Sequence, residues 1–214
     1  MNVRVPPKPR LRGWFHQVAF VVSIPAGIGL VALARGAAAQ ASAAIFAAGL
    51  TGLYGVSALY HRRRWSTNAQ RVMKYLDHSM IFVLIAASYT PITVLALRPA
   101  LGITLLVLAW AGAVIGIVVT ITRLERWRGV GLAMYLGLGW LPVVAAPQLA
   151  RALSRPEILL LVAGGLLYTA GAVVLARNRP DPWPMTFGYH EVWHAFVVCA
   201  GACHYILVLL LVRA

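Results

Sequence analysis

Two histidines and a glutamate lie close together near the end of the chain, in the stretch HEVWH at residues 190–194. The stretch fits H-E-x-x-H, in which two histidines on one helix bind zinc and the glutamate is the general base of a metalloprotease. Positions four apart share a helix face, so His190 and His194 can bind one cation. Two interpretations are open: a protease with Glu191 as its base, or a different metal site.

A third histidine and an aspartate lie at the borders of two earlier apolar runs. Ser57 and His61 are four residues apart at the end of one run, and Asp77 opens the next. Three imidazoles and an open fourth position that holds water form a catalytic zinc site, in which the metal makes that water ionise near neutral pH. We therefore predict Zn²⁺ as the cofactor and His61, His190 and His194 as its ligands.

Asp77 and Ser57 are the predicted catalytic residues of this site. Asp77 could hold the water as a general base, or orient a ligand imidazole. Ser57 would place its hydroxyl one turn below His61. We expect His16 to be a surface group rather than a further ligand. His204 lies ten residues beyond the HEVWH stretch, about 15 Å deeper along a helix, so we expect it to form a hydrogen bond within a helix bundle.

The composition is that of an integral membrane protein. Of 214 residues, 61% are hydrophobic and 11% are charged, whereas a soluble domain has about 25% charged residues. A helix needs about 20 apolar residues to cross the bilayer core, and seven stretches meet or approach this length. We therefore predict an all-α fold, a single domain over residues 1–214 with seven transmembrane helices and a short basic tail at 1–12. The predicted spans are 13–34, 36–60, 79–97, 99–122, 129–150, 158–176 and 192–212.

The basic residues predict how these spans are oriented. Fourteen of the 19 Lys and Arg residues fall in the tail and in the loops on its side of the membrane, and five fall on the other side. The positive-inside rule then places the N-terminus in the cytoplasm and the C-terminus outside, in a multi-pass protein of the plasma membrane. The predicted metal site lies near the cytoplasmic face. Because topology accounts for the positive charge, we expect membrane lipids as partners and no nucleic acid.

Several motifs resemble those of the haemolysin III proteins of bacteria, the prokaryotic arm of the progestin and adipoQ receptor superfamily. The matching stretches are PRLRGWFH at 9–16, SALYH at 57–61, LDHS at 76–79, ASYTP at 87–91, HEVWH at 190–194 and GACHY at 201–205. The resemblance covers essentially the whole chain. It implies a seven-helix bundle with a cytoplasmic N-terminus and zinc near the cytoplasmic face, held by His61, His190 and His194, with Asp77 at the zinc-bound water and Ser57 nearby.

The resemblance specifies the residues of a metal site more clearly than it specifies the reaction that the site would catalyse. The superfamily is grouped with alkaline ceramidases, which suggests zinc-dependent hydrolysis of an amide or ester in a lipid, and bacterial members are linked to haemolysis and to control of membrane lipids. The leading hypothesis is thus a zinc protein that acts on or senses membrane lipids. A cytolytic, pore-forming protein and a receptor or sensor with structural zinc are the alternatives. A protease is disfavoured, because Asp77 and His61 supply a base and a third ligand without Glu191.

Overall fold

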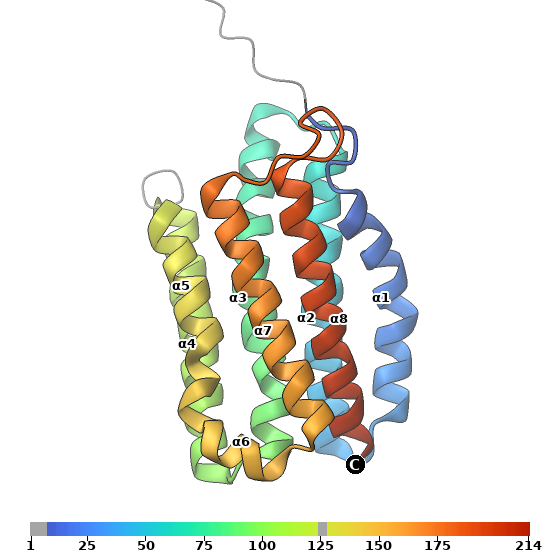
Figure 1. Ribbon diagram of the computed structural model, residues 1–214, viewed down its shortest axis with the longest axis vertical. Helices are drawn as coiled ribbons and strands as arrows, with labels where there is room; N and C mark the ends of the chain where they lie inside the picture. Colours follow the sequence, from blue (N-terminus) through green and yellow to red (C-terminus); the bar gives the residue numbers. More distant parts are fainter. Residues whose placement is uncertain (1–7, 124–127) are drawn as a thin grey trace, which may run out of the picture.

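The computed structural model describes residues 8–123 and 128–214, and its helices run along one common axis (Figure 1). Within these ranges, seven helical segments are long and apolar enough to cross a membrane, and the fifth of them is built from α5, η1 and α6. The predicted all-α fold with seven spans is confirmed. The elements are α1 Trp14–Leu33, α2 Ala37–Arg62, α3 Thr67–Ala96, α4 Pro99–Arg123, α5 Arg128–Trp140, η1 Leu141–Ala145, α6 Ala146–Ala152, α7 Arg155–Arg177 and α8 Tyr189–Arg213.

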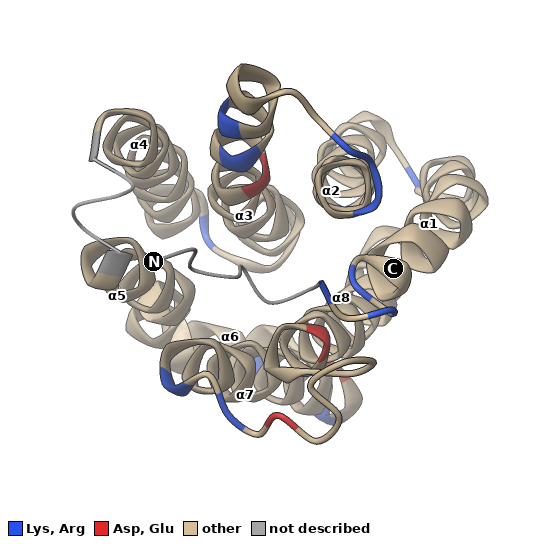
Figure 2. Ribbon diagram, turned by 90° about the horizontal axis from the view of Figure 1, so that it is seen from above, with Lys and Arg blue, Asp and Glu red and all other residues tan. Residues whose placement is uncertain are grey.

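Helices that follow one another in the sequence are neighbours in space, and α8 returns to pack beside α1 (Figure 2). The tightest neighbours approach through small residues, as is usual between membrane helices. At Gly49 of α2, a Cβ atom would lie 2.6 Å from the Cβ of Ala87 on α3. The spacing of these two helices, which carry His61 and Asp77, therefore requires glycine at this position.

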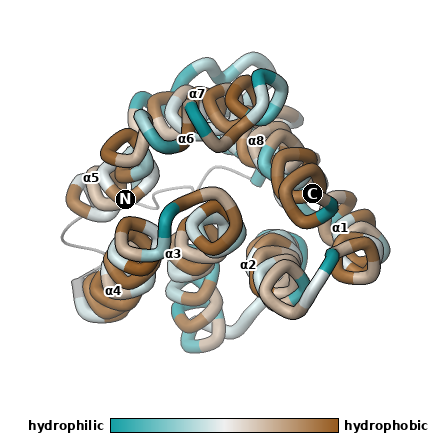
Figure 3. Tube along the Cα trace, turned by 90° about the horizontal axis from the view of Figure 1, so that it is seen from below, coloured by the Kyte–Doolittle hydropathy of each residue, from teal (hydrophilic) through white to brown (hydrophobic). Residues whose placement is uncertain are grey.

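Large apolar side chains are exposed on the outside of the bundle as well as packed in its interior, and Figure 3 shows how hydrophobic residues are distributed along the helices. On α1, Val21 is 62% exposed and Ile28 is 68% exposed. In water such a surface would be a strong liability, but lipid tails are as apolar as these side chains. The outward faces of the spans are therefore suited to contact with the bilayer core.

A proline divides the fifth span into separate helical segments. Pro142 has no N–H, so the carbonyl of Leu138, four residues earlier, loses its helical partner. The hydroxyl of Tyr89 on α3 donates a hydrogen bond of 2.6 Å to this carbonyl. Nearby, the indole of Trp140 donates to the hydroxyl of Thr169 on α7, at 3.1 Å. Neighbouring helices thus supply the polar partners that a broken helix needs inside a membrane.

Two helices extend beyond their apolar runs at the end of the bundle where α1 begins. α3 starts at Thr67 instead of the predicted residue 79, and α8 starts at Tyr189 instead of 192. Polar residues at the membrane border can remain helical because their side chains reach water. The extensions carry Asp77 and His190, so both lie on regular helices and not on loops.

Candidate metal centre

The first histidine of the site stands at the last turn of α2. His61 lies there with its side chain 7% exposed, and Ser57 is buried one turn deeper on the same helix. Gly13, just before α1, comes close to this turn, since a Cβ atom there would lie 2.8 Å from the Cβ of His61. Gly13 also has a φ of 80°, which favours glycine. The start of α1 therefore fits against the end of α2.

The other two predicted ligands lie on the first two turns of α8, whose start is strongly fixed. The backbone N–H of Gly188 donates to the carboxylate of Glu191 at 2.9 Å, and the N–H of Tyr189 donates to that of Asp181 at 2.8 Å. These bonds satisfy N–H groups that have no partner within the helix. His190 and His194 follow on one face, and His194 is buried.

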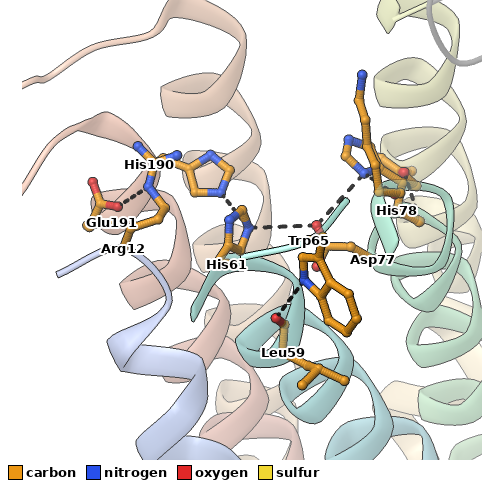
Figure 4. Close-up of polar contacts among 10 residues, drawn as sticks. Arg12, Leu59, His61, Trp65, Asp77, His78, His190 and Glu191 are labelled. Carbon is orange, nitrogen blue, oxygen red and sulfur yellow. Dashed lines mark hydrogen bonds and ion pairs between the residues drawn. The ribbon is translucent and has the colours of Figure 1, made fainter. Parts of the chain in front are cut away.

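The structure brings His61, His190 and His194 together. One ring nitrogen of each lies within 4.8 Å of the other two. The Nε2 atoms of His61 and His190 are 3.2 Å apart (Figure 4). Two nitrogens bound to one tetrahedral zinc at about 2.0–2.1 Å would be roughly 3.3 Å apart. The three imidazoles therefore fit a metal ion by donor type and by spacing.

Asp77 lies at the edge of this cluster. Its Oδ2 atom is 3.8 Å from Nε2 of His61 and 3.8 Å from Nδ1 of His78, and its side chain is 13% exposed. The hydroxyl of Ser57 lies close enough to interact with the Asp77 carboxylate. At these distances the carboxylate does not form a direct hydrogen bond to His61.

Glu191, the glutamate of the H-E-x-x-H pattern, is engaged elsewhere. It is completely buried, it accepts the N–H of Gly188, and it forms an ion pair with Nε of Arg12. Figure 4 shows Glu191 and Asp77 on opposite sides of His61. The carboxylate thus caps its own helix and fixes the segment before α1, a contact that the sequence did not predict.

His16 is not the surface group that we expected from the sequence. It is 3% exposed, and its ring stacks on that of His194 with 3.9 Å between centroids and 7° between planes. The correction has a physical reason: α1 carries apolar residues around most of its circumference, so no hydrophobic stripe indicates which side faces inward. The position of His16 in the sequence also did not predict its contact with His194, because the two residues lie on the first and the last span.

The remaining two histidines lie outside the cluster. His78 makes a 2.9 Å contact between its Nδ1 and the carbonyl of Lys74 on its own helix. His204 lies deeper on α8, where its ring fits against Gly164 of α7, which leaves no room there for a Cβ atom, and meets the ring of Tyr168 at 5.6 Å between centroids. The position inside the bundle, away from the metal, agrees with the prediction, but the predicted hydrogen bond is not made, since both ring nitrogens are buried and unpaired among the described residues.

The histidine cluster opens into a cavity of about 930 Å³. The cavity begins at Arg12, His61 and Asp77 and continues between α3, α5, α7 and α8 to Leu149 in α6. Most of its wall is apolar, and it includes Leu84, Ile92, Leu132 and Val197. Such a volume falls in the range of small-molecule sites, and its elongated apolar interior could hold a hydrocarbon chain with a polar end at the histidines.

Comparison with known proteins gives a consistent result. The family described as "Haemolysin-III related" matches residues 5–205. The chain is 33% identical over 197 residues to "Hemolysin-3 homolog" of Bacillus subtilis (strain 168), covering 91% of this chain and 89% of that protein. It is also 33% identical to "Hemolysin-3" of Bacillus cereus, covering 91% and 87%. The human "Monocyte to macrophage differentiation factor" is 28% identical over 165 residues, 75% of this chain and 66% of that protein.

Proposed function

The chain belongs to the haemolysin III family of multi-pass membrane proteins, and from this premise we propose that it is a zinc-dependent hydrolase of an amide or ester bond in a membrane lipid. The observation that carries the proposal is the convergence of three imidazoles at the mouth of a long apolar cavity. A metal site alone would suit many functions. The cavity connects it to a lipid-like substrate.

Zinc is the metal that the donor set favours. His61, His190 and His194 offer three neutral nitrogen donors, the ligand set of catalytic zinc sites that keep one position open. Manganese and magnesium prefer oxygen donors, and Asp77, whose carboxylate faces the cluster, lies at its edge. When bound, the metal would polarise the substrate carbonyl and activate a water molecule.

Asp77 is the residue suited to accept a proton in this reaction. Its carboxylate faces the cluster 3.8 Å from His61, too far for a direct hydrogen bond to that ring, and Ser57 lies beside it to hold its orientation. A general base must lie within hydrogen-bond reach of the proton that it removes, directly or through one water. Glu191 does not meet this requirement, because Arg12 and Gly188 already occupy its carboxylate.

The cavity determines which molecules can reach these residues. A long acyl chain would fill the space between α3, α5, α7 and α8, and its amide or ester would then lie near the polar end formed by His61 and Asp77. The apolar walls would exclude water from most of the chain, which stabilises binding by about 25 cal/mol for each Å² of apolar surface buried. This arrangement favours lipids over soluble peptides as substrates.

The proposal is tested with purified protein in detergent or lipid nanodiscs. We expect about one zinc ion per chain by elemental analysis, and hydrolysis of a ceramide or a phospholipid ester that ends when a chelator removes the metal and returns when zinc is added. His61→Ala should lose both zinc and turnover, whereas Asp77→Asn should keep zinc and lose turnover. Protein without stoichiometric zinc would disprove the proposal. Zinc without turnover on any acyl lipid would favour the sensor with structural metal.

A cytolytic function is the second candidate, and the names of the two Bacillus relatives favour it. The seven apolar helices oppose it, because a chain with this surface is suited to residence in a membrane and not to release from the cell. Dye release from liposomes by purified protein, with Asp77→Asn as the comparison, separates the two. Leakage that is independent of Asp77 would support cytolysis, and intact liposomes would exclude it.

A further inference from the structure

The orientation of the His194 ring is not set by a hydrogen bond to its Nδ1 atom. Its Nδ1 atom is buried and has no hydrogen-bond partner among the residues that the structure describes. Histidines that bind metal almost always donate their second ring N–H to a carboxylate, a carbonyl or water, which sets the orientation of the ring. The contacts that the described residues make with the faces and edges of the His194 ring therefore bear on its orientation.

The contact that His194 does make is with His16. The two rings are nearly parallel, 7° apart in plane and 3.9 Å apart between centroids. The other rings of the cluster meet His194 at steep angles, 60° for His61 and 58° for His190. Of these three neighbours, His16 alone presents a flat face to the His194 ring, so it is the one that can restrain rotation of the ring out of its plane.

His16 offers its ring face and not a hydrogen bond. Both of its ring nitrogens are buried and unpaired in the described part of the chain, and Tyr54 of α2 packs against the ring at 5.3 Å between centroids. Leaving two buried polar atoms unpaired costs free energy. The contact of His16 with the predicted ligand His194 is made through the face of its ring.

The backbone before α1 keeps this contact in register. The N–H groups of Arg10 and Leu11 donate to the carbonyls of Met185 and Thr186 in the loop that precedes α8, at 3.0 and 3.1 Å. The ion pair of Arg12 with Glu191 joins the same segment to the first turn of α8. The two helices that make the stacking contact are therefore tied together close to it. Arg12 lies four residues before His16, and its partner Glu191 lies three residues before His194.

We propose that His16 is a positioning residue, which holds the imidazole of His194 by ring stacking in the plane where it faces His61 and His190. The inference rests on the proposed metal centre, but it concerns a residue outside the predicted ligands. The proposed ligands come from α2 and α8. The positioning role of His16 adds α1 to the helices that form the site.

The test compares two substitutions of His16 that differ only in ring character. His16→Phe keeps a flat ring without nitrogens, and His16→Leu keeps an apolar side chain without a ring. Phe20→Leu is the matched control, because Phe20 lies one turn further along α1 and packs against Gly55 of α2, away from the cluster. For each protein, the zinc dissociation constant is measured by chelator competition, and the visible spectrum of the Co²⁺-substituted protein reports the geometry of the ligands.

We expect His16→Leu to weaken zinc binding by about 10- to 100-fold, the loss that follows removal of residues that orient metal ligands, and to change the cobalt spectrum. His16→Phe and Phe20→Leu should bind zinc within about threefold of the unchanged protein, with its cobalt spectrum. Thermal unfolding of the metal-free proteins shows whether His16→Leu and Phe20→Leu destabilise the fold equally.

Two results would overturn the positioning role while leaving the metal centre intact. In the first, His16→Leu binds zinc as tightly as the unchanged protein. In the second, His16→Phe loses as much affinity as His16→Leu, which would assign the effect to the ring nitrogens. Absence of zinc from the unchanged protein is a different result, because it overturns the metal centre itself and the positioning role with it.

Discussion

Two carboxylates border the histidine cluster, and their surroundings assign them different roles. Glu191 is buried, paired with Arg12 and bonded to the first N–H groups of its helix. Asp77 is partly exposed, lies in the wall of the cavity, and has Ser57 beside it. A buried and fully paired carboxylate contributes to the structure of its region, and removal of one partner from such a pair is strongly destabilising.

Exchanging each carboxylate for its amide should therefore give opposite results. We expect Asp77→Asn to reduce lipid hydrolysis by about 10²- to 10⁴-fold, the usual contribution of a general base, with little change in thermal stability. We expect Glu191→Gln to lower the melting temperature while hydrolysis per zinc-loaded molecule stays within about tenfold. Turnover and thermal unfolding are measured at equal zinc occupancy. If Glu191→Gln lost turnover and Asp77→Asn kept it, Glu191 would be the general base, as in the H-E-x-x-H proteases.

The sequence predicted part of this site well. Helical spacing and the borders of the apolar runs brought His61, His190 and His194 into one group, and the structure places their nitrogens within 4.8 Å of one another. His16 and Arg12 were missed. Their contacts join residues about 180 positions apart, and they depend on how α1 is rotated about its axis, which a helix with apolar residues on most sides does not reveal.

At the scale of single helices, hydrogen bonds between spans compensate for the breaks that proline introduces. The carbonyl of Leu138, released by Pro142, receives the hydroxyl of Tyr89. A second tyrosine makes a similar hydrogen bond, in which Tyr205 donates to the carbonyl of Ala26 in α1 at 2.9 Å. This carbonyl also has a partner within its own helix, the N–H four residues later. The first carbonyl depends on its tyrosine, and the second does not.

Removing the two hydroxyls should therefore have unequal effects. We expect Tyr89→Phe to lower the free energy of unfolding by about 1 kcal/mol or more, because it leaves a buried acceptor unpaired. The melting temperature should fall by roughly 2–4 °C for each kcal/mol in a chain of this size. Tyr205→Phe is the control, with a smaller fall. Equal losses measured by thermal unfolding in detergent would contradict the role given to Pro142.

The boundaries of the helices could be predicted only where apolar residues end. The first, second and fourth spans match within a few residues, whereas α3 begins at Thr67, well before residue 79. Hydropathy detects the part of a helix that lies in lipid and not its continuation into the interface. The interface is where Asp77 and His190 lie, so the helical setting of the candidate site was the least predictable part of the spans.

At the scale of the whole molecule, the described basic residues lie in the loops and near the helix ends, and more of them lie at the end of the bundle where α1 begins. The more basic end also carries the histidine cluster. We expect this end to face the cytoplasm. Reporter enzymes that are active only outside the cytoplasm should be inactive when fused after Arg64 and active when fused after Arg98. The reverse pattern would place the metal centre on the outer face.

The length of the cavity gives a second prediction at this scale. Gly139 of the fifth span lies on the cavity wall, and a Cβ atom there would meet no atom within 4 Å. Gly139→Leu should therefore fold normally, keep its zinc and lower the activity on long-chain lipids by about tenfold, because the side chain occupies space needed by the substrate. Gly29→Leu on α1 also enters open space, outside the cavity lining, and should leave activity unchanged. Equal activities would exclude the cavity as the substrate site.

The predicted metal ligands are split between α2 and α8, with 129 positions between His61 and His190. During synthesis, α2 enters the membrane long before α8 has been made, so His61 remains without its partners while the four spans between them are inserted. At elongation rates of about 5–20 residues per second, this interval lasts several seconds or longer. Zinc cannot be bound by all three histidines until α8 has docked. At the proposed site, metal loading would thus be a late step of biogenesis, and nascent chains arrested before α8 should be metal-free.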